Sequence, residues 1–242
     1  MKRIRVRDPA GSIRDGELVG DDVEVAGRTY SLDEVEVFPP VRPSKVLGVG
    51  FNYRSRLEEG ESPQRPFVWW KGGRNVVSGH GDTVTLPESG EVVFEAELGV
   101  VIGEQCRNVT PDEAMDVVEG FTCVNDLTDL SAQDDSSMFR IKSFDNSAPM
   151  GPVVASPDHV SAQPRVQLWI DGNRKQDSAG DEFVFSIREV IASVTERVTL
   201  EPEDVILMGN PGDFSPLTDG DRVTIEIEGI GRLEHDVKVG RV

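Results

Sequence analysis

The sequence predicts an α+β fold that is mainly β and contains a few short helices. Short runs of β-branched and apolar residues, which favour strands, recur along the whole chain. They include Val46–Gly50, Pro66–Lys71, Phe121–Val124, Val166–Ile170, Val205–Met208 and Arg222–Glu228. Capping boxes, which start helices, indicate two helices, one from Thr110–Glu113 to about Glu119 and one from Ser186–Glu189 to about Arg197. Because strands outnumber helices, the pattern does not indicate a doubly wound sheet.

Residues 1–42 are predicted to form a small N-terminal β subdomain or arm. Its strand-like pieces, separated by Gly and Asp turns, are Lys2–Arg7, Glu17–Val19, Val23–Val25 and Thr29–Ser31. Three prolines then punctuate the chain at Pro39, Pro40 and Pro43, so we place a boundary near residue 42. Residues 43–242 make up the main domain, and the chain of 242 residues is long enough to bury a sizeable core.

The chain is strongly acidic and poor in lysine. Its 25 Lys and Arg residues against 44 Asp and Glu residues give a formal net charge of −19. Such a composition suggests adaptation to high salt, where screening weakens self-repulsion. It argues against nucleic acid as a partner, because no basic stripe is visible. With no apolar run that could span a bilayer and no signal-peptide pattern, we expect a cytoplasmic protein without a membrane partner. Cys106 and Cys123 are expected to be reduced, buried thiols.

The segment Val92–Gly103 carries two glutamates inside an otherwise apolar predicted strand. Strand side chains alternate between two faces, so Glu95 and Glu97 lie side by side on one face. Burying two neighbouring carboxylates is costly unless a positive group lies between them. A divalent cation with oxygen ligands, Mg²⁺ or Ca²⁺, would meet that need. The alternative is an edge strand whose glutamates face water or an arginine.

Several motifs follow one another in a fixed order and carry a resemblance. They are Gly48–Arg54, Phe94–Gly103, Asn125-Asp126, Lys142–Asp145, Pro149–Pro152, Gly209–Pro211 and Ile225–Gly231. From about residue 44 to the C-terminus, the chain resembles the fumarylacetoacetate hydrolase family. The resemblance implies a mixed β roll, usually a homodimer, and Mg²⁺ or Mn²⁺ held by Glu95, Glu97 and Asp126. By itself, Asp126 would be interpreted as the cap of a turn.

The family resemblance also implies a small anionic substrate, a 2-oxo acid or β-diketo acid that chelates the metal. Family enzymes hydrolyse, decarboxylate, isomerise or hydrate such acids. Three carboxylates and one dication leave a charge of about −1, so a further cation is needed, and Lys142 is the candidate. Lys142 is predicted to stabilise an enolate, or to shuttle a proton if desolvation lowers its pKa; otherwise it is an ordinary surface lysine. Gln133 matches a family position that hydrogen-bonds substrate; otherwise it is a loop glutamine.

The lid motif departs from the pattern of family members that hydrolyse C–C bonds. Those members read Asn-Tyr-x-x-His-x-x-Glu, whereas this chain keeps Tyr53 and Glu59 but has Arg56 at the histidine position. Arginine stays protonated and cannot act as a general base. We therefore predict Glu59, or its neighbour Glu58, as the remaining base, and Tyr53 and Arg56 as substrate-binding residues. The histidines are expected on solvent-side loops outside this motif: His80, His159 and His235.

Three further positions also differ from the family pattern and predict a reshaped pocket. Leu130 stands where an arginine is common, so Arg56 is a candidate to replace that charge and to clamp a distal carboxylate. Asn146 and Asn210 stand where threonines are expected. Asparagine keeps the capacity for hydrogen bonds, and Asn210 is predicted to bind substrate.

Two function hypotheses follow. The first is a divalent-metal-dependent enzyme acting on a small 2-oxo or β-diketo acid. Isomerisation, decarboxylation or dehydration is then favoured over C–C hydrolysis, because the water-activating histidine is missing. The second is a metal-binding homologue with little catalysis that serves as a ligand-binding or structural protein. A hydrolase that uses Glu58 or Glu59 as its base also stays open.

Overall fold

The computed structural model describes residues 1–242 apart from residues 89, 133–136, 179–181 and 242. Its strands are β1 (Lys2–Arg7), β2 (Ile13–Val19), β3 (Asp22–Val25), β4 (Arg28–Ser31), β5 (Glu36–Phe38), β6 (Val46–Gly50), β7 (Phe67–Gly72), β8 (Val77–Ser78), β9 (Thr83–Pro87), β10 (Val92–Val93), β11 (Ala96–Ile102), β12 (Val118–Asn125), β13 (Thr128–Asp129), β14 (Ala148–Ala155), β15 (Val166–Ile170), β16 (Asn173–Ser178), β17 (Val205–Leu207), β18 (Arg222–Ile227) and β19 (Gly231–Gly240). The α-helices are α1 (Met138–Lys142) and α2 (Ile187–Thr195). Short 3₁₀ helices are η1 (Leu32–Glu34), η2 (Arg54–Arg56), η3 (Arg74–Val76), η4 (Ala114–Val117), η5 (Leu130–Ala132) and η6 (Pro157–His159).

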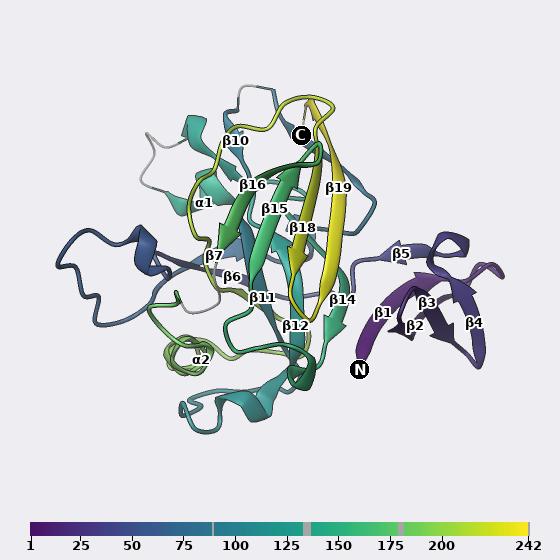
Figure 1. The fold of residues 1–242 in the computed structure, drawn as a ribbon. Coiled ribbons are helices and arrows are strands. Elements are labelled where there is room, and N and C mark those ends of the chain that lie inside the picture. Colours follow the sequence, from purple (N-terminus) through teal and green to yellow (C-terminus); the bar gives the residue numbers. More distant parts are fainter. Residues whose placement is uncertain (89, 133–136, 179–181, 242) are drawn as a thin grey trace.

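Two β-sheets pack against each other and confirm the mainly β prediction (Figure 1). The larger sheet has the strand order β4-β3-β2-β1-β14-β12-β11-β17-β6-β7, and the smaller has the order β16-β15-β18-β19-β9. Most neighbours are antiparallel; β6 and β17 pair in parallel, as do β9 and β19. Strand β7 therefore lies at one edge of the larger sheet, while β11 and β12 lie in its interior.

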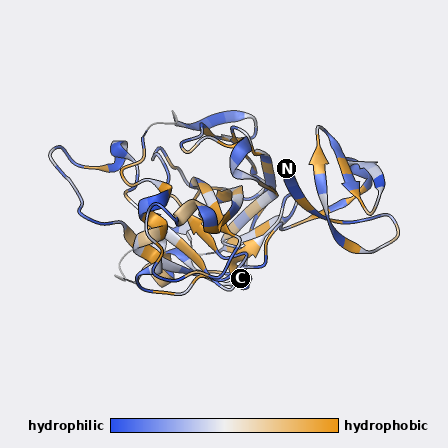
Figure 2. Ribbon diagram, turned by 90° about the horizontal axis from the view of Figure 1, so that it is seen from below, coloured by the Kyte–Doolittle hydropathy of each residue, from blue (hydrophilic) through white to orange (hydrophobic). Residues whose placement is uncertain are grey.

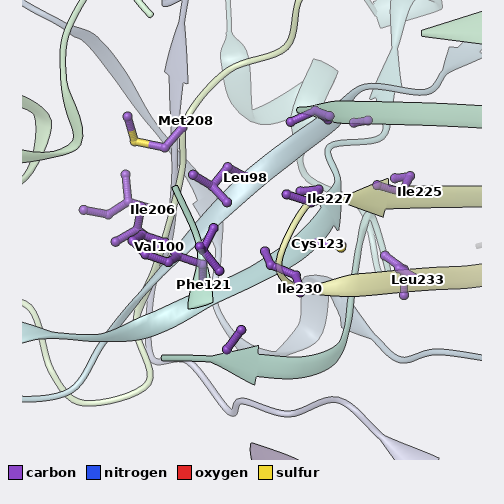
Figure 3. Packing of buried hydrophobic residues seen from close by; sticks show 14 of the residues in the cluster. Leu98, Val100, Phe121, Cys123, Ile206, Met208, Ile225, Ile227, Ile230 and Leu233 are labelled. Carbon is purple, nitrogen blue, oxygen red and sulfur yellow. The ribbon is translucent and has the colours of Figure 1, made fainter. Parts of the chain in front are cut away.

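The hydrophobic core lies between the two sheets (Figure 3). Leu98 and Val100 of β11 and Phe121 of β12 contribute from the larger sheet, and Ile225 and Ile227 of β18 from the smaller one. The buried positions of β18 alternate with more exposed ones, as expected for a strand with one face in the core. Figure 2 shows the hydrophobic residues gathered along the strands, with the loops largely hydrophilic. Each fully buried aliphatic side chain contributes roughly 2 kcal/mol to folding.

The N-terminal segment forms the predicted strands, and β1 joins them to the larger sheet. Strand β1 pairs with β14, with Ile4 opposite Val153, and also with β2 and β5. Strands β2, β3 and β4 then extend the sheet outward and lie to one side of the molecule in Figure 1. The division of the chain near residue 42 stays a prediction.

The predicted helix from Thr110 to about Glu119 is wrong. Its capping contact is present, since the Thr110 amide and hydroxyl both donate to Glu113 Oε2. The chain nevertheless forms only η4 and then enters β12 at Val118, which pairs with Ile102. The pairing of β12 in the sheet overrides the local helix signal. The second predicted helix is confirmed as α2, where Ser186 accepts from the Glu189 amide.

Two other expectations need correction. The single strand over Val92–Gly103 is divided into β10 and β11, with Phe94 and Glu95 between them. His235 is not on a solvent-side loop but is buried in β19, with its side chain beside Asn125. Among the described residues, none of the helices is long and apolar enough to cross a membrane.

Candidate metal centre

Three buried carboxylates converge where β11 begins and β12 ends. Glu95, Glu97 and Asp126 each offer an oxygen within 4.8 Å of the others. Glu95 is 6% exposed, and Glu97 and Asp126 are fully buried. The structure thus places the three predicted metal ligands together, away from solvent.

The antiparallel register of β11 and β12 explains this convergence. Ala96 lies opposite Asn125, so Glu95 and Asp126 flank the same end of the ladder. The Asp126 amide donates to the Glu95 carbonyl at 2.8 Å, and the Glu95 amide donates to Asn125 Oδ1 at 3.0 Å. These contacts continue the β11–β12 register by one residue and hold Glu95 beside Asp126.

His235 of β19, a strand of the smaller sheet, contacts this end of the larger sheet through Asn125. Its Nε2 lies 3.0 Å from Asn125 Nδ2, and its Nδ1 lies 3.4 Å from the Asp236 carbonyl. This pattern fits a neutral ring whose Nε2 accepts from the Asn125 amide. Burial lowers the pKa of His235 to about 4, although Asp236 opposes the shift.

Lys142, at the end of α1, is buried against the carboxylates. Its Nζ donates to Glu95 Oε2 and Asp126 Oδ2, both at 2.6 Å, and to Thr128 Oγ1 at 2.7 Å. It also lies 5.1 Å from the centre of the Trp69 ring. Burial alone would lower the pKa of Lys142, but the carboxylates Asp126, Glu95 and Glu97 outweigh burial and raise it. The alternative of a surface lysine is excluded.

Lys71 is a second buried lysine at the centre, and sequence reasoning did not identify it. Its Nζ lies 2.5 Å from Asp126 Oδ1 and donates to the carbonyls of Lys142 and Leu127. Burial lowers the pKa of Lys71, and the ion pair with Asp126 partly opposes this shift. The signal available was the lysine itself, which ends the apolar segment Pro66–Lys71 in a chain with few lysines.

Glu97 retains an oxygen without a hydrogen-bond partner among the described residues. Its Oε2 accepts from the Gly209 amide at 2.6 Å, whereas its Oε1 is buried and unpaired. Gly209 has a φ of +88°, and a Cβ there would lie 3.0 Å from the Val49 carbonyl oxygen, so this donor position requires glycine. Burial raises the pKa of Glu97 well above its usual range, and the nearby Asp126 charge adds to the shift.

This set of donors fits a divalent cation. Three oxygen-bearing side chains converge, and two of their oxygens, Glu97 Oε1 and Asp126 Oδ1, are buried without a hydrogen-bond partner among the described residues. Asp126 Oδ1 has the Lys71 ammonium beside it, whereas Glu97 Oε1 has no such contact within the described ranges, which is unfavourable unless a cation binds it. Burial also raises the pKa of Glu95, while Lys142 opposes the shift. Lys142 and Lys71 compensate only part of the charge of the three carboxylates, so the cluster still favours a dication.

Of the predicted lid residues, Arg56 and Glu59 are more exposed than the three carboxylates, whereas Tyr53 is as buried as they are. Tyr53 is buried, and its ring meets Phe183 edge to face at 5.0 Å between centroids. Arg56 is half-buried, and its guanidinium lies 5.3 Å from the Phe214 ring centre. No acidic partner of Arg56 is found in the described part of the chain. Glu59 is exposed on the turn after η2, outside the buried cluster.

Two of the predicted substrate-binding residues remain, Asn210 and Gln133. The Asn210 side chain is half-buried, and its Oδ1 accepts from the Gly212 amide at 2.9 Å, so it stabilises the loop after Gly209. Gln133 lies outside the described residues. Gln176 of β16, which sequence reasoning missed, is buried and links two parts of the site. Its Oε1 accepts from the Ala96 amide at 3.0 Å, and its Nε2 donates to the Gly212 carbonyl.

Comparisons with known proteins identify the family of this chain. The family model described as fumarylacetoacetate (FAA) hydrolase C-terminal matches residues 45–238. The chain belongs to the fumarylacetoacetate hydrolase family. It is 34% identical over 232 residues to oxaloacetate tautomerase YisK of Bacillus subtilis, covering 88% of this chain and 77% of that protein.

Two solved structures share the fold over nearly the whole chain. The 5-carboxymethyl-2-hydroxymuconate delta-isomerase of Mycobacterium smegmatis has a TM-score of 0.91 and 28% identity, covering 100% of both chains. The maleylpyruvate hydrolase of Sphingobium sp. SYK-6, in complex with manganese(II) and pyruvate, has a TM-score of 0.85 and 26% identity, again covering 100% of both. These three relatives are thus named as a tautomerase, an isomerase and a hydrolase.

Proposed function

We propose that this protein is a divalent-metal-dependent enzyme acting on a small 2-oxo or β-diketo acid. Tautomerisation or another isomerisation, decarboxylation or dehydration is favoured over C–C hydrolysis. The observation that carries the proposal is the convergence of three buried carboxylates with a buried lysine. The similarity to an oxaloacetate tautomerase and to a structure holding manganese and pyruvate supports the substrate class and the metal.

Glu95, Glu97 and Asp126 would hold the ion, with Mg²⁺ or Mn²⁺ as the candidates. When bound, such an ion would act as a Lewis acid that withdraws charge from a 2-oxo group. Lys142 carries its proton at Nζ beside the same carboxylates, where it offsets their negative charge and can stabilise an enolate; its raised pKa favours this role over proton transfer. Burial of these groups excludes water and strengthens their electrostatic effect.

Arg56 is proposed to bind a distal carboxylate of the substrate. It is half-buried beside Phe214 and has no acidic partner among the described residues, although the chain has 44 acidic side chains. A guanidinium binds a carboxylate through two parallel hydrogen bonds. Arg56 cannot replace the lid histidine as a base, which is why C–C hydrolysis is the less favoured reaction.

The test is turnover of a panel of 2-oxo acids with Mg²⁺ or Mn²⁺ in molar KCl. The panel contains oxaloacetate, an acylpyruvate and a 2-keto-3-deoxy sugar acid, and enol absorbance follows tautomerisation. We expect metal-dependent turnover that Glu97→Gln abolishes and the partly exposed control Glu226→Gln retains. Metal binding without turnover would favour the ligand-binding alternative, and absence of metal binding would refute the proposal. A cytoplasmic homodimer stays a prediction, tested for assembly by light scattering.

A further inference from the structure

The Lys71 ammonium donates two hydrogen bonds to backbone carbonyls and forms one ion pair at the candidate metal centre. Its Nζ contacts Asp126 Oδ1 at 2.5 Å, the Lys142 carbonyl at 2.6 Å and the Leu127 carbonyl at 3.1 Å. Lys71 is 0% exposed, and a buried ammonium is unfavourable unless its donors are paired. The Lys71 Nζ atom, on β7, thus links the residues that follow β12 to the end of α1.

The two lysines divide the two oxygens of Asp126 between them. Lys142 Nζ contacts Asp126 Oδ2 and Glu95 Oε2, each at 2.6 Å, so Oδ2 is the oxygen on the side of Glu95. Lys71 takes Oδ1. With both oxygens held in this way, the carboxylate cannot rotate freely about its bond.

We propose that Lys71 is a positioning residue that limits Asp126 to a single oxygen at the metal centre. A carboxylate can bind a dication through one oxygen or through both. Because Lys71 retains Oδ1, Asp126 offers Oδ2 alone, and the position that Oδ1 would have occupied on the ion stays open. A substrate that chelates through its carboxylate and 2-oxo oxygens needs two such positions. This inference rests on the proposed function, since it requires an ion at the three carboxylates.

The experiment compares Lys71→Met with Lys45→Met as a matched control. Lys45 forms another largely buried ion pair, 2.7 Å from Asp204 Oδ2, with side chains 13% and 0% exposed. It lies outside the carboxylate cluster, so it reports the general cost of losing such a pair. The probes are Mn²⁺ alone, its water content by proton relaxation, and oxalate as a chelating dianion on the Mn²⁺-loaded protein.

For Lys71→Met we expect Mn²⁺ affinity that does not fall, about one fewer water on the ion, and oxalate binding weakened by about tenfold or more. Lys45→Met should keep the wild-type water content and oxalate affinity. Wild-type oxalate affinity in Mn²⁺-loaded Lys71→Met would overturn the inference, as would an equal loss in Lys45→Met. Failure of the wild-type protein to bind Mn²⁺ would instead refute the proposed function.

A double variant keeps the test valid if Lys71→Met does not fold. Removing one member of a buried ion pair leaves an uncompensated charge, whereas Lys71→Met combined with Asp126→Asn removes both charges. The amide of Asp126→Asn offers the ion only one oxygen. In that single variant Lys71 is still present but has no second carboxylate oxygen to hold. At saturating Mn²⁺, the double variant should bind oxalate as Asp126→Asn does. A further loss of about tenfold in the double variant would overturn the positioning role.

Discussion

The candidate metal centre and the predicted lid hold their candidate site residues in different ways. The centre places Glu97, Asp126 and Lys142 at the ends of paired or packed elements, buried and linked by charge-assisted hydrogen bonds. The lid places Arg56 and Glu59 on a short 3₁₀ helix and the turn after it, where they are half-buried and exposed. We propose from this difference that the centre supplies the chemistry, while the lid selects the substrate and the reaction.

The largest effect is expected from Lys142→Met, which removes the buried ammonium of the centre. Turnover should fall by about 10²- to 10³-fold, the usual effect of removing one donor that stabilises a developing negative charge. Mn²⁺ binding should not weaken, because a competing positive charge is lost. Steady-state kinetics and Mn²⁺ titration measure both quantities. Glu59→Gln is the comparison from the lid and should change isomerisation or decarboxylation little; an equal loss would break the distinction between centre and lid.

A smaller effect is expected from Arg56→Ala, which tests substrate selection by the lid. A hydrogen-bonded ion pair with a distal carboxylate contributes roughly 1.5–3 kcal/mol, so KM for oxaloacetate should rise by about 10- to 100-fold. KM for a 2-oxo acid without a second carboxylate should not change. Arg54→Ala, an exposed arginine of the same 3₁₀ helix, is the control. An equal rise in KM for both substrates would show that Arg56 does not recognise the distal group.

The same contrast explains how much could be predicted from the sequence. Glu95 and Glu97 were predicted as neighbours because side chains alternate along a strand, whereas Asp126 was predicted as a ligand only from the family resemblance. The register of β11 and β12, which brings the three together, could not be obtained from the sequence pattern. Lys71 was missed because an apolar segment that ends in lysine indicates an exposed end as readily as a buried ion pair. His235 was misplaced for a related reason, since its burial depends on Asn125 of a strand 110 residues away.

The failed helix at Thr110 shows the same limit within the fold. The capping contact to Glu113 is local and is present, but the β-branched residues that follow pair with β11 instead. Local signals therefore indicated which residues interact nearby. They did not indicate which distant strand would compete for the next segment.

The burial of neutral His235 beside the centre can be tested by measuring how the free energy of unfolding depends on pH. Its pKa is about 4 when folded and 6.5 when unfolded, so the unfolded chain binds its proton first as pH falls. The contribution of neutral His235 to stability is complete above pH 6.5 and is lost as the pH falls from 6.5 to about 4. About 2 kcal/mol of stability should be lost between pH 7 and pH 5. Urea unfolding should show a pH dependence that is smaller by this amount in His235→Gln. Equal pH dependence in both proteins would mean that His235 is not held neutral beneath Asn125.

The smallest effect is expected from salt, which separates the charged surface from the centre. With a net charge of −19, self-repulsion over the surface should weaken as KCl rises from low to molar concentration. A gain of about 1 kcal/mol corresponds to a rise in Tm of about 2–4 °C for a chain of this size. The ion pairs of Lys71 and Lys142 are buried and screened less, so KCl should not lower the Tm difference between Lys71→Met and the wild-type protein. A Tm that is highest at low salt would contradict the expected adaptation to high salt, and a Tm difference that vanishes in KCl would show that the centre is as open to solvent as the lid.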